Sequence, residues 1–183
     1  MLSRSNWLIL ALAVLAAAIG GHVARHGQPP TAVDNTAAAG LIGQPVPAIS
    51  LPDLDGRQHA LRDYRGRRML LNFWASWCRP CLEEMPALDE AQIKFGENAP
   101  IVLGIAMDQA DHVEAFLATH PVSYPILLGN MTSPSTSQQL GNASQMLPYS
   151  VLIDDNGRIL ATHAGVLSAS QLELWLDPGH RDR

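Results

Sequence analysis

Cysteine is scarce in this 183-residue chain, and clustered basic charge is almost absent. The chain has two cysteines, and its longest basic run is the pair Arg67-Arg68. A formal net charge of −5 without a basic cluster argues against a nucleic-acid-binding protein. No cysteine lies near position 20, which excludes a lipoprotein. With 47% hydrophobic residues and no internal repeat, the length and composition predict one globular domain with additional segments.

The N-terminal 21 residues hold the longest apolar stretch. Arg4 precedes an unbroken apolar run over 7–19, which two glycines extend. About 18 helical residues, each rising about 1.5 Å, cover roughly 27 Å, which is enough to span the hydrocarbon of a bilayer. We expect residues 1–21 to be a membrane anchor. A signal sequence cleaved near Ala16-Ala17-Ala18 is the first alternative, and a buried core helix is the second.

Anchor and signal sequence lead to the same compartment. Both export the remainder of the chain, so we expect a domain that faces the oxidising periplasm, held at the inner membrane if the segment is an anchor. Residues 22–40 are expected to be a linker, because Pro29-Pro30 and small residues interrupt any apolar pattern. Residues 41–177 are expected to fold as the domain, with a tail at 178–183.

The order of apolar patterns within the domain predicts its fold class. A β-hairpin is expected over 48–61 around an Asp-Gly turn. Near-continuous apolar runs over 68–74 and 101–106 are typical of strands buried on both faces. The remaining predicted elements are helices at 79–95, 111–119 and 168–176, a helix or turn at 133–140, and strands at 124–128, 149–154 and 158–163. This alternation predicts a mixed α/β sheet flanked by helices.

Both cysteines lie at one predicted strand-to-helix junction, in Trp77-Cys78-Arg79-Pro80-Cys81. The helix dipole and unpaired N–H groups at a helix start stabilise a thiolate. Cys78 is therefore the expected nucleophile, and Cys81, one turn further along, is expected to resolve the mixed disulfide. A structural disulfide would close too short a loop to stabilise the chain much. A metal site would need more than two sulfur ligands, and a copper-binding module that adds a Met or His stays an alternative.

The residues around the cysteines suggest a substrate-binding surface. Pro80 fits the first helical turn, where a missing N–H is harmless. Arg79 either favours the Cys78 thiolate through its charge or faces solvent. Trp77 is expected to cover the cysteines and to offer an apolar docking surface. Trp74 is expected to pack in the core.

Carboxylates and a proline are further candidates for the site. Either Glu83 or Glu84 is a candidate to move a proton to or from Cys81, the alternative being solvated helix-face carboxylates; Asp108 carries the same ambiguity. Pro148 precedes a predicted strand. If its peptide bond is cis and faces the cysteines, the Leu147 backbone is free to pair with an extended substrate; a trans proline opening the strand is the alternative.

The motifs together resemble those of the thioredoxin superfamily, and most of all the TlpA/ResA-like membrane-anchored thiol-disulfide oxidoreductases. The resemblance covers about residues 41–177. Its specific elements are the run Leu71-Asn72-Phe73-Trp74-Ala75-Ser76-Trp77-Cys78-Arg79-Pro80-Cys81, the run Glu83-Glu84-Met85-Pro86, and Leu147-Pro148-Tyr149 leading into a strand. A bare pair of cysteines three apart would be a weak signal. The same pair within these flanking residues is a specific one.

The resemblance implies a thioredoxin-like fold with an N-terminal β-hairpin and a central βα insertion at 99–128. It implies a protein disulfide reductase whose redox group is the Cys78–Cys81 pair, with no further cofactor, and a cis Pro148 beside Cys78. It implies electrons from a membrane thiol donor, and targets such as apocytochrome c during cytochrome c biogenesis, copper-binding proteins or other exported disulfides.

Two departures from related patterns affect the mechanism. A thiol peroxidase on this fold usually has a Thr shortly before its reactive cysteine, and Trp74 and Ala75 occupy those places here. Thioredoxin itself has a buried aspartate where this chain has Asn72. Asparagine does not titrate, so the proton of Cys81 needs another acceptor, and Glu84 or Glu83 becomes the main candidate.

Overall fold

A five-stranded mixed sheet forms the centre of the domain. The computed structural model describes residues 36–96 and 100–177. The strand order is β5-β4-β3-β6-β7. β3, β4 and β5 run parallel, whereas β6 and β7 are antiparallel to their neighbours. The strands are β3 (Met69–Trp74), β4 (Ile101–Ala106), β5 (Ile126–Leu128), β6 (Tyr149–Ile153) and β7 (Ile159–Ala164).

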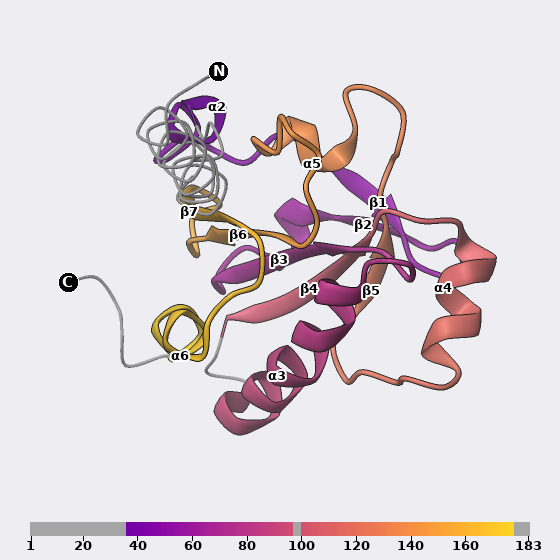
Figure 1. The fold of residues 1–183 in the computed structure, drawn as a ribbon. Coiled ribbons are helices and arrows are strands. Elements are labelled where there is room, and N and C mark those ends of the chain that lie inside the picture. Colours follow the sequence, from indigo (N-terminus) through magenta and orange to yellow (C-terminus); the bar gives the residue numbers. More distant parts are fainter. Residues whose placement is uncertain (1–35, 97–99, 178–183) are drawn as a thin grey trace, which may run out of the picture. The chain divides into compact units, whose positions relative to one another are not determined.

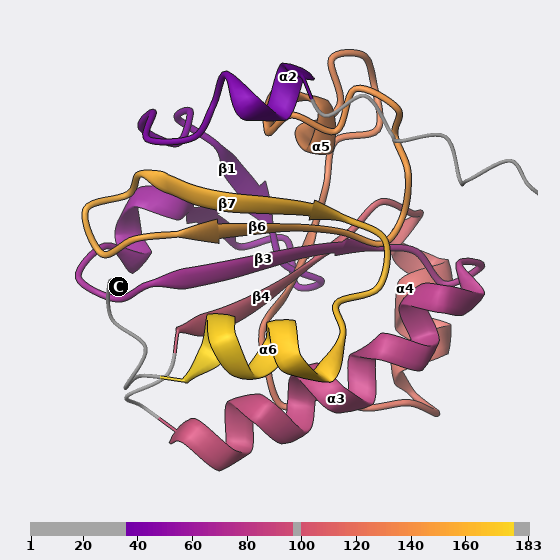
Figure 2. The same ribbon diagram turned by 60° about the vertical axis from the view of Figure 1, so that its left-hand side comes forward.

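Two helices cover one face of this sheet, α3 (Arg79–Phe95) and α6 (Ala169–Leu176) (Figures 1 and 2). Residues of β3 alternate between the two faces, as the pleat requires. Leu70 packs in the core shared with α3 and α6, whereas Leu71 and Phe73 belong to the core on the opposite face. Burial on both faces explains the near-continuous apolar run of this strand in the sequence. The predicted thioredoxin-like α/β fold, with a mixed sheet between helices, is confirmed.

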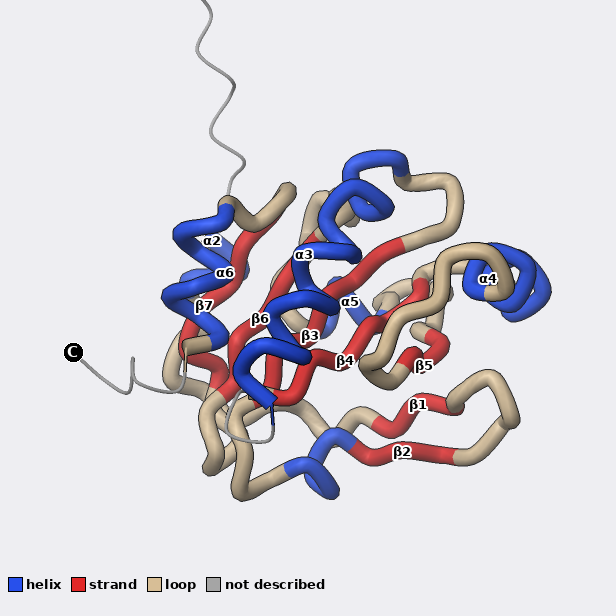
Figure 3. The backbone as a smooth tube through the Cα atoms, turned by 90° about the horizontal axis from the view of Figure 1, so that it is seen from below, coloured by secondary structure: helices blue, strands red, loops and turns tan. Residues whose placement is uncertain are grey.

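The predicted hairpin forms a small separate sheet, β1 (Ser50–Pro52) with β2 (Gln58–Ala60), followed by the 3₁₀-helix η1 (Leu61–Tyr64). Its turn uses Gly56 in the left-handed region (φ 80°), where a side chain would be strained. The Asp53 carboxylate accepts hydrogen bonds from two N–H groups of the same turn. Figure 3 shows the hairpin beside β5, and an isolated bridge joins Asp53 to Leu127.

The segment predicted as the central insertion, 99–128, contains β4, α4 (Ala110–Leu117) and β5 in chain order. The helix begins one residue before the predicted position, because Gln109 has the extended backbone of the N-cap. A short helix, α5 (Thr136–Gln139), then leads to β6, and a capping box at Ser135 starts it. The insertion extends the parallel part of the sheet to its β5 edge.

The predicted linker ends earlier than expected. Residues 36–39, placed in the linker by their small side chains, form the helix α2 (Thr36–Ala39). Ala38 is 1% exposed and lies close to Gly141, so it belongs to the folded domain. Within 36–96 and 100–177 no helix is long and apolar enough to cross a membrane. The predicted anchor at 1–21 and the tail at 178–183 lie outside the described residues.

Candidate functional site

The two cysteines form a disulfide at the junction of β3 and α3. Cys78 is the N-cap of α3, and its N–H donates to the Ala75 carbonyl 3.0 Å away, which closes the turn after the strand. The exposed fractions are 5% for Cys78 and 0% for Cys81, so Cys78 is the more accessible sulfur of the pair. In the described part of the chain, no three His, Cys, Asp or Glu side chains are arranged to hold a metal ion.

The side chains next to the disulfide point outward. Trp77 is 70% exposed, so its indole forms an apolar surface beside the site and does not bury itself over the cysteines. The Nε of Arg79 lies 3.0 Å from Glu83, and both side chains are largely exposed. The proposed action of Arg79 on Cys78 therefore competes with an ion pair along the helix surface. Pro80 lies in the first turn of α3, as predicted.

Burial separates the two glutamates. Glu83 is exposed, whereas Glu84 points under the helix and is 2% exposed. The Glu84 carboxylate accepts hydrogen bonds from the Leu167 N–H and, at 2.9 Å, from Nδ2 of Asn72. Burial raises the pKa of Glu84, and these two hydrogen bonds offset only part of the effect. The structure thus selects Glu84 as the buried titratable group on the cysteine-bearing helix.

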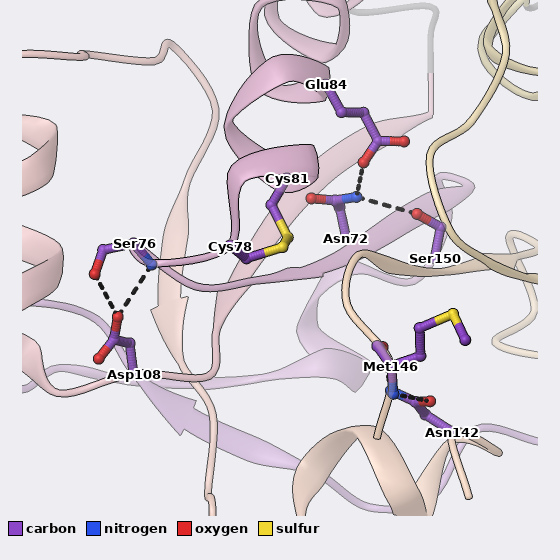
Figure 4. Close-up of a disulfide and its surroundings, with 9 residues drawn as sticks. All are labelled: Asn72, Ser76, Cys78, Cys81, Glu84, Asp108, Asn142, Met146 and Ser150. Atoms are coloured by element: carbon purple, nitrogen blue, oxygen red, sulfur yellow. Dashed lines mark hydrogen bonds between the residues drawn. A yellow bond between two sulfur atoms is a disulfide. The ribbon is translucent and has the colours of Figure 1, made fainter. Parts of the chain in front are cut away.

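Asn72 joins Glu84 to the neighbouring strand (Figure 4). It lies on β3 directly opposite Ser150 of β6, on the sheet face that α3 covers. Its Nδ2 donates to Ser150 Oγ at 3.1 Å as well as to Glu84. Its Oδ1 is buried and has no hydrogen-bond partner among the described residues. Sequence reasoning noted that Asn72 cannot titrate, but gave no role to the amide itself.

Asp108 lies at the other side of the disulfide in Figure 4. Asp108 and Ser76 each lie two residues beyond the paired ends of the parallel strands β4 and β3, Ala106 and Trp74. One Asp108 oxygen accepts the Ser76 N–H (3.0 Å) and hydroxyl (2.6 Å). The other oxygen accepts the Gln109 N–H (2.8 Å) and lies 3.2 Å from Nδ1 of His112.

The electrostatics of Asp108 are opposite to those of Glu84. Burial, the largest single influence, would raise the pKa of Asp108, but the hydrogen bonds from Ser76, Gln109 and His112 together lower it below the usual range. Asp108 therefore stays ionised and holds the loop that carries Ser76 and Trp77. Nothing in its contacts supports a proton-transfer role at Cys81.

Asn142 is a residue of the site that sequence reasoning missed. It is 1% exposed, and its amide binds both backbone polar groups of Met146: Oδ1 accepts the N–H (3.1 Å) and Nδ2 donates to the carbonyl (2.8 Å). This fixes the chain just before Leu147 and Pro148. No spacing or motif marks Asn142 in the sequence, because the contact depends on the folded loop.

The Leu147–Pro148 peptide bond is cis, as the resemblance implies. Leu147 packs against the hydrophobic cluster that contains both cysteines. A loop distant from the cysteines in the sequence therefore lies close to the disulfide. Pro148 immediately precedes β6, and its carbonyl accepts the Gly165 N–H at 2.8 Å. The structure therefore places the predicted docking loop beside the redox pair.

Comparisons with known proteins agree with this geometry. The Redoxin family model matches residues 41–174. The chain is 31% identical over 138 residues to the thioredoxin-like protein YneN of Bacillus subtilis, covering 74% of this chain and 78% of YneN. It is 30% identical over 145 residues to the thiol-disulfide oxidoreductase ResA of Geobacillus thermodenitrificans, covering 79% and 80% of the two chains.

A solved structure shows the same fold. The crystal structure of a Chlorobium tepidum protein assigned as thiol:disulfide interchange protein DsbE aligns with a TM-score of 0.62 and 28% identity, over 71% of this chain and 89% of the other. A buried disulfide at a strand-to-helix junction of a thioredoxin-like fold defines a thiol-disulfide oxidoreductase. The chain belongs to the Redoxin family, as a thiol-disulfide oxidoreductase of the ResA and DsbE type.

Proposed function

We propose that this oxidoreductase works as a reductase: it transfers two electrons from the Cys78–Cys81 dithiol to disulfides of exported proteins at the outer face of the inner membrane. The observation that carries the proposed exchange chemistry is the graded burial of the pair, with Cys78 at the helix start and Cys81 fully buried near Glu84 (Figure 4), and the reducing direction is taken from the resemblance to ResA-like proteins. That arrangement suits one attacking and one resolving sulfur. The apolar segment 7–19 supports export and anchoring.

The reaction balances in two exchange steps. The Cys78 thiolate attacks one sulfur of the substrate disulfide, which forms a mixed disulfide and releases the other substrate sulfur as a thiolate. Cys81 then loses its proton and attacks Sγ of Cys78, which forms the Cys78–Cys81 disulfide and releases the second substrate thiol. Glu84 is the proposed acceptor of the Cys81 proton. A membrane thiol donor then reduces the enzyme disulfide again.

Substrate docking is assigned to the surface around the disulfide. Trp77 supplies exposed apolar area, and Arg79 and Pro80 occupy the outer side of the first helical turn. The backbone of Leu147, held in place through Met146 by Asn142, offers an edge for an extended substrate segment. Apocytochrome c before haem attachment, copper-binding proteins and other exported disulfide proteins are the proposed substrates.

Insulin reduction tests the exchange activity. The purified chain with dithiothreitol should precipitate reduced insulin faster than dithiothreitol alone, and Cys78→Ser should abolish the acceleration. Cys81→Ser should instead accumulate a mixed disulfide with insulin, because the first attack remains possible. Full activity in Cys78→Ser would rule out the assigned nucleophile. Recovery of the full chain in the soluble fraction after osmotic shock would rule out the anchor.

A further inference from the structure

The buried amide of Asn72 has one end bound and the other end free. Nδ2 is bound to Glu84 and Ser150, and Asn72 is 0% exposed. Nδ2 of Asn72 donates to both Glu84 and Ser150, so the amide nitrogen faces these two side chains. This fixes the orientation of the amide, and Oδ1 must point the other way. Figure 4 shows that oxygen directed toward Cys81.

The other end of the amide, Oδ1 of Asn72, accepts no hydrogen bond from the described residues. An unsatisfied buried acceptor is unfavourable for folding. The strand pattern places Asn72 on the same face of β3 as Trp74, which belongs to the cluster of the cysteines. Cys81 belongs to that cluster, and it is the group of the cluster beside α3 that gains a proton when the disulfide is reduced.

We propose that Asn72 is a positioning residue for the resolving thiol: in the reduced enzyme the Cys81 Sγ–H donates a hydrogen bond to Oδ1 of Asn72. Reduction of the disulfide adds two electrons and two protons, and one of these protons resides on Cys81. The oxidised enzyme has no such proton, so the hydrogen bond exists only in the dithiol form. Asn72 thus stabilises the reduced enzyme relative to the disulfide.

The same contact orders the chemistry of the two sulfurs. A hydrogen bond to the neutral thiol holds the proton on Cys81 while Cys78 attacks the substrate. The proton leaves Cys81 only when the mixed disulfide has formed. Its proposed acceptor is Glu84, whose carboxylate is bound to the nitrogen end of the same amide. This inference rests on the exchange roles proposed for Cys78 and Cys81, and it adds a reason why the non-titrating Asn72 is useful in place of an aspartate.

Infrared spectroscopy of the reduced Cys78→Ala chain tests the contact directly, since Cys81 is then the only thiol. The S–H stretch should lie below that of an unbonded thiol, and it should return to the unbonded position in Cys78→Ala/Asn72→Leu. An unbonded S–H stretch in the single variant overturns the proposal, and this result does not require the Leu variant to fold.

A glutathione equilibrium tests the thermodynamic consequence. Asn72→Leu should shift the enzyme about tenfold toward its disulfide form, which corresponds to about 30 mV. Ser150→Ala, which removes a partner of Nδ2 and leaves Oδ1 in place, should shift the equilibrium less than twofold. Equal destabilisation of the oxidised and reduced forms by Asn72→Leu would show a purely structural role. If the wild-type chain does not reduce insulin, the proposed function is contradicted. The Cys81–Asn72 hydrogen bond would still be tested by the infrared measurement.

Discussion

Two buried carboxylates, Glu84 and Asp108, flank the Cys78–Cys81 disulfide and respond to burial in opposite ways (Figure 4). Glu84 is 2% exposed and accepts two hydrogen bonds, so burial dominates and raises its pKa. Asp108 is 8% exposed, but Ser76, Gln109 and His112 together keep its pKa low. More hydrogen bonds reach Asp108 than Glu84, so the balance between donors and burial gives the two pKa values opposite directions.

The largest difference should appear in the resolving step. Glu84→Gln removes the proposed proton acceptor and should slow release of substrate from the mixed disulfide about a hundredfold, the usual scale of general base catalysis. Rapid-quench trapping of the mixed disulfide at pH 7 measures the rate. Glu83→Gln makes the same chemical change on the exposed neighbour and should leave the rate within twofold. Equal rates in Glu84→Gln and wild type would remove Glu84 from the mechanism.

Asp108 should affect stability more than proton transfer. Asp108→Ala leaves the N–H groups of Ser76 and Gln109 without their acceptor, and we expect a loss of about 2 kcal/mol in the free energy of unfolding. Asp108→Asn keeps an acceptor oxygen and should lose less. Urea unfolding of the oxidised chains provides the values. Alanine and asparagine variants as stable as wild type would show that the loop does not depend on this carboxylate.

The pH dependence of stability should have opposite signs at the two sites. Because the pKa of Glu84 is raised on folding, its contribution is complete below the unfolded pKa and is lost as pH rises through the folded pKa. Because the pKa of Asp108 is lowered, its contribution is present above the unfolded pKa and is lost as pH falls through the folded pKa.

Paired denaturation curves between pH 3 and pH 8 can check these signs. Relative to wild type, Glu84→Gln should gain stability as pH rises, whereas Asp108→Asn should gain stability as pH falls. Parallel curves for the two variants would mean that the two carboxylates titrate alike. That outcome would remove the basis of the comparison.

The smallest effect is expected at His112. Its side chain is 56% exposed and its Nδ1 lies 3.2 Å from Asp108, so solvent replaces most of what the contact contributes. His112→Gln should change the free energy of unfolding by less than about 0.5 kcal/mol. A loss as large as that of Asp108→Ala would show that His112, and not the loop N–H groups, keeps Asp108 in place.

The sequence predicted the elements whose signals are local. The apolar run of β3, the helix after the cysteines and the strand after Pro148 were all placed within a few residues, because burial on both faces and helix starts leave direct marks in a sequence. The fold followed from the order of these elements, and the roles predicted for the two cysteines follow from the motif between β3 and α3.

What the sequence could not predict depends on contacts between distant segments. Glu84 and Glu83 are equivalent in the sequence, and only the packing of α3 on the sheet shows that Glu84 is buried. Ser76 meets Asp108 across 32 residues, and Ser150 meets Asn72 across 78 residues. The early end of the linker, too, follows from Ala38 packing near Gly141.

The reduction potential of the Cys78–Cys81 couple tests the proposed function most directly. We expect a value nearer to the about −270 mV of thioredoxin than to the about −120 mV of strongly oxidising disulfide donors. Equilibration of the full chain with defined glutathione mixtures, followed by thiol alkylation, gives this value. A potential at the oxidising end would show that the chain donates disulfides to exported proteins, and it would contradict the assignment as a reductase.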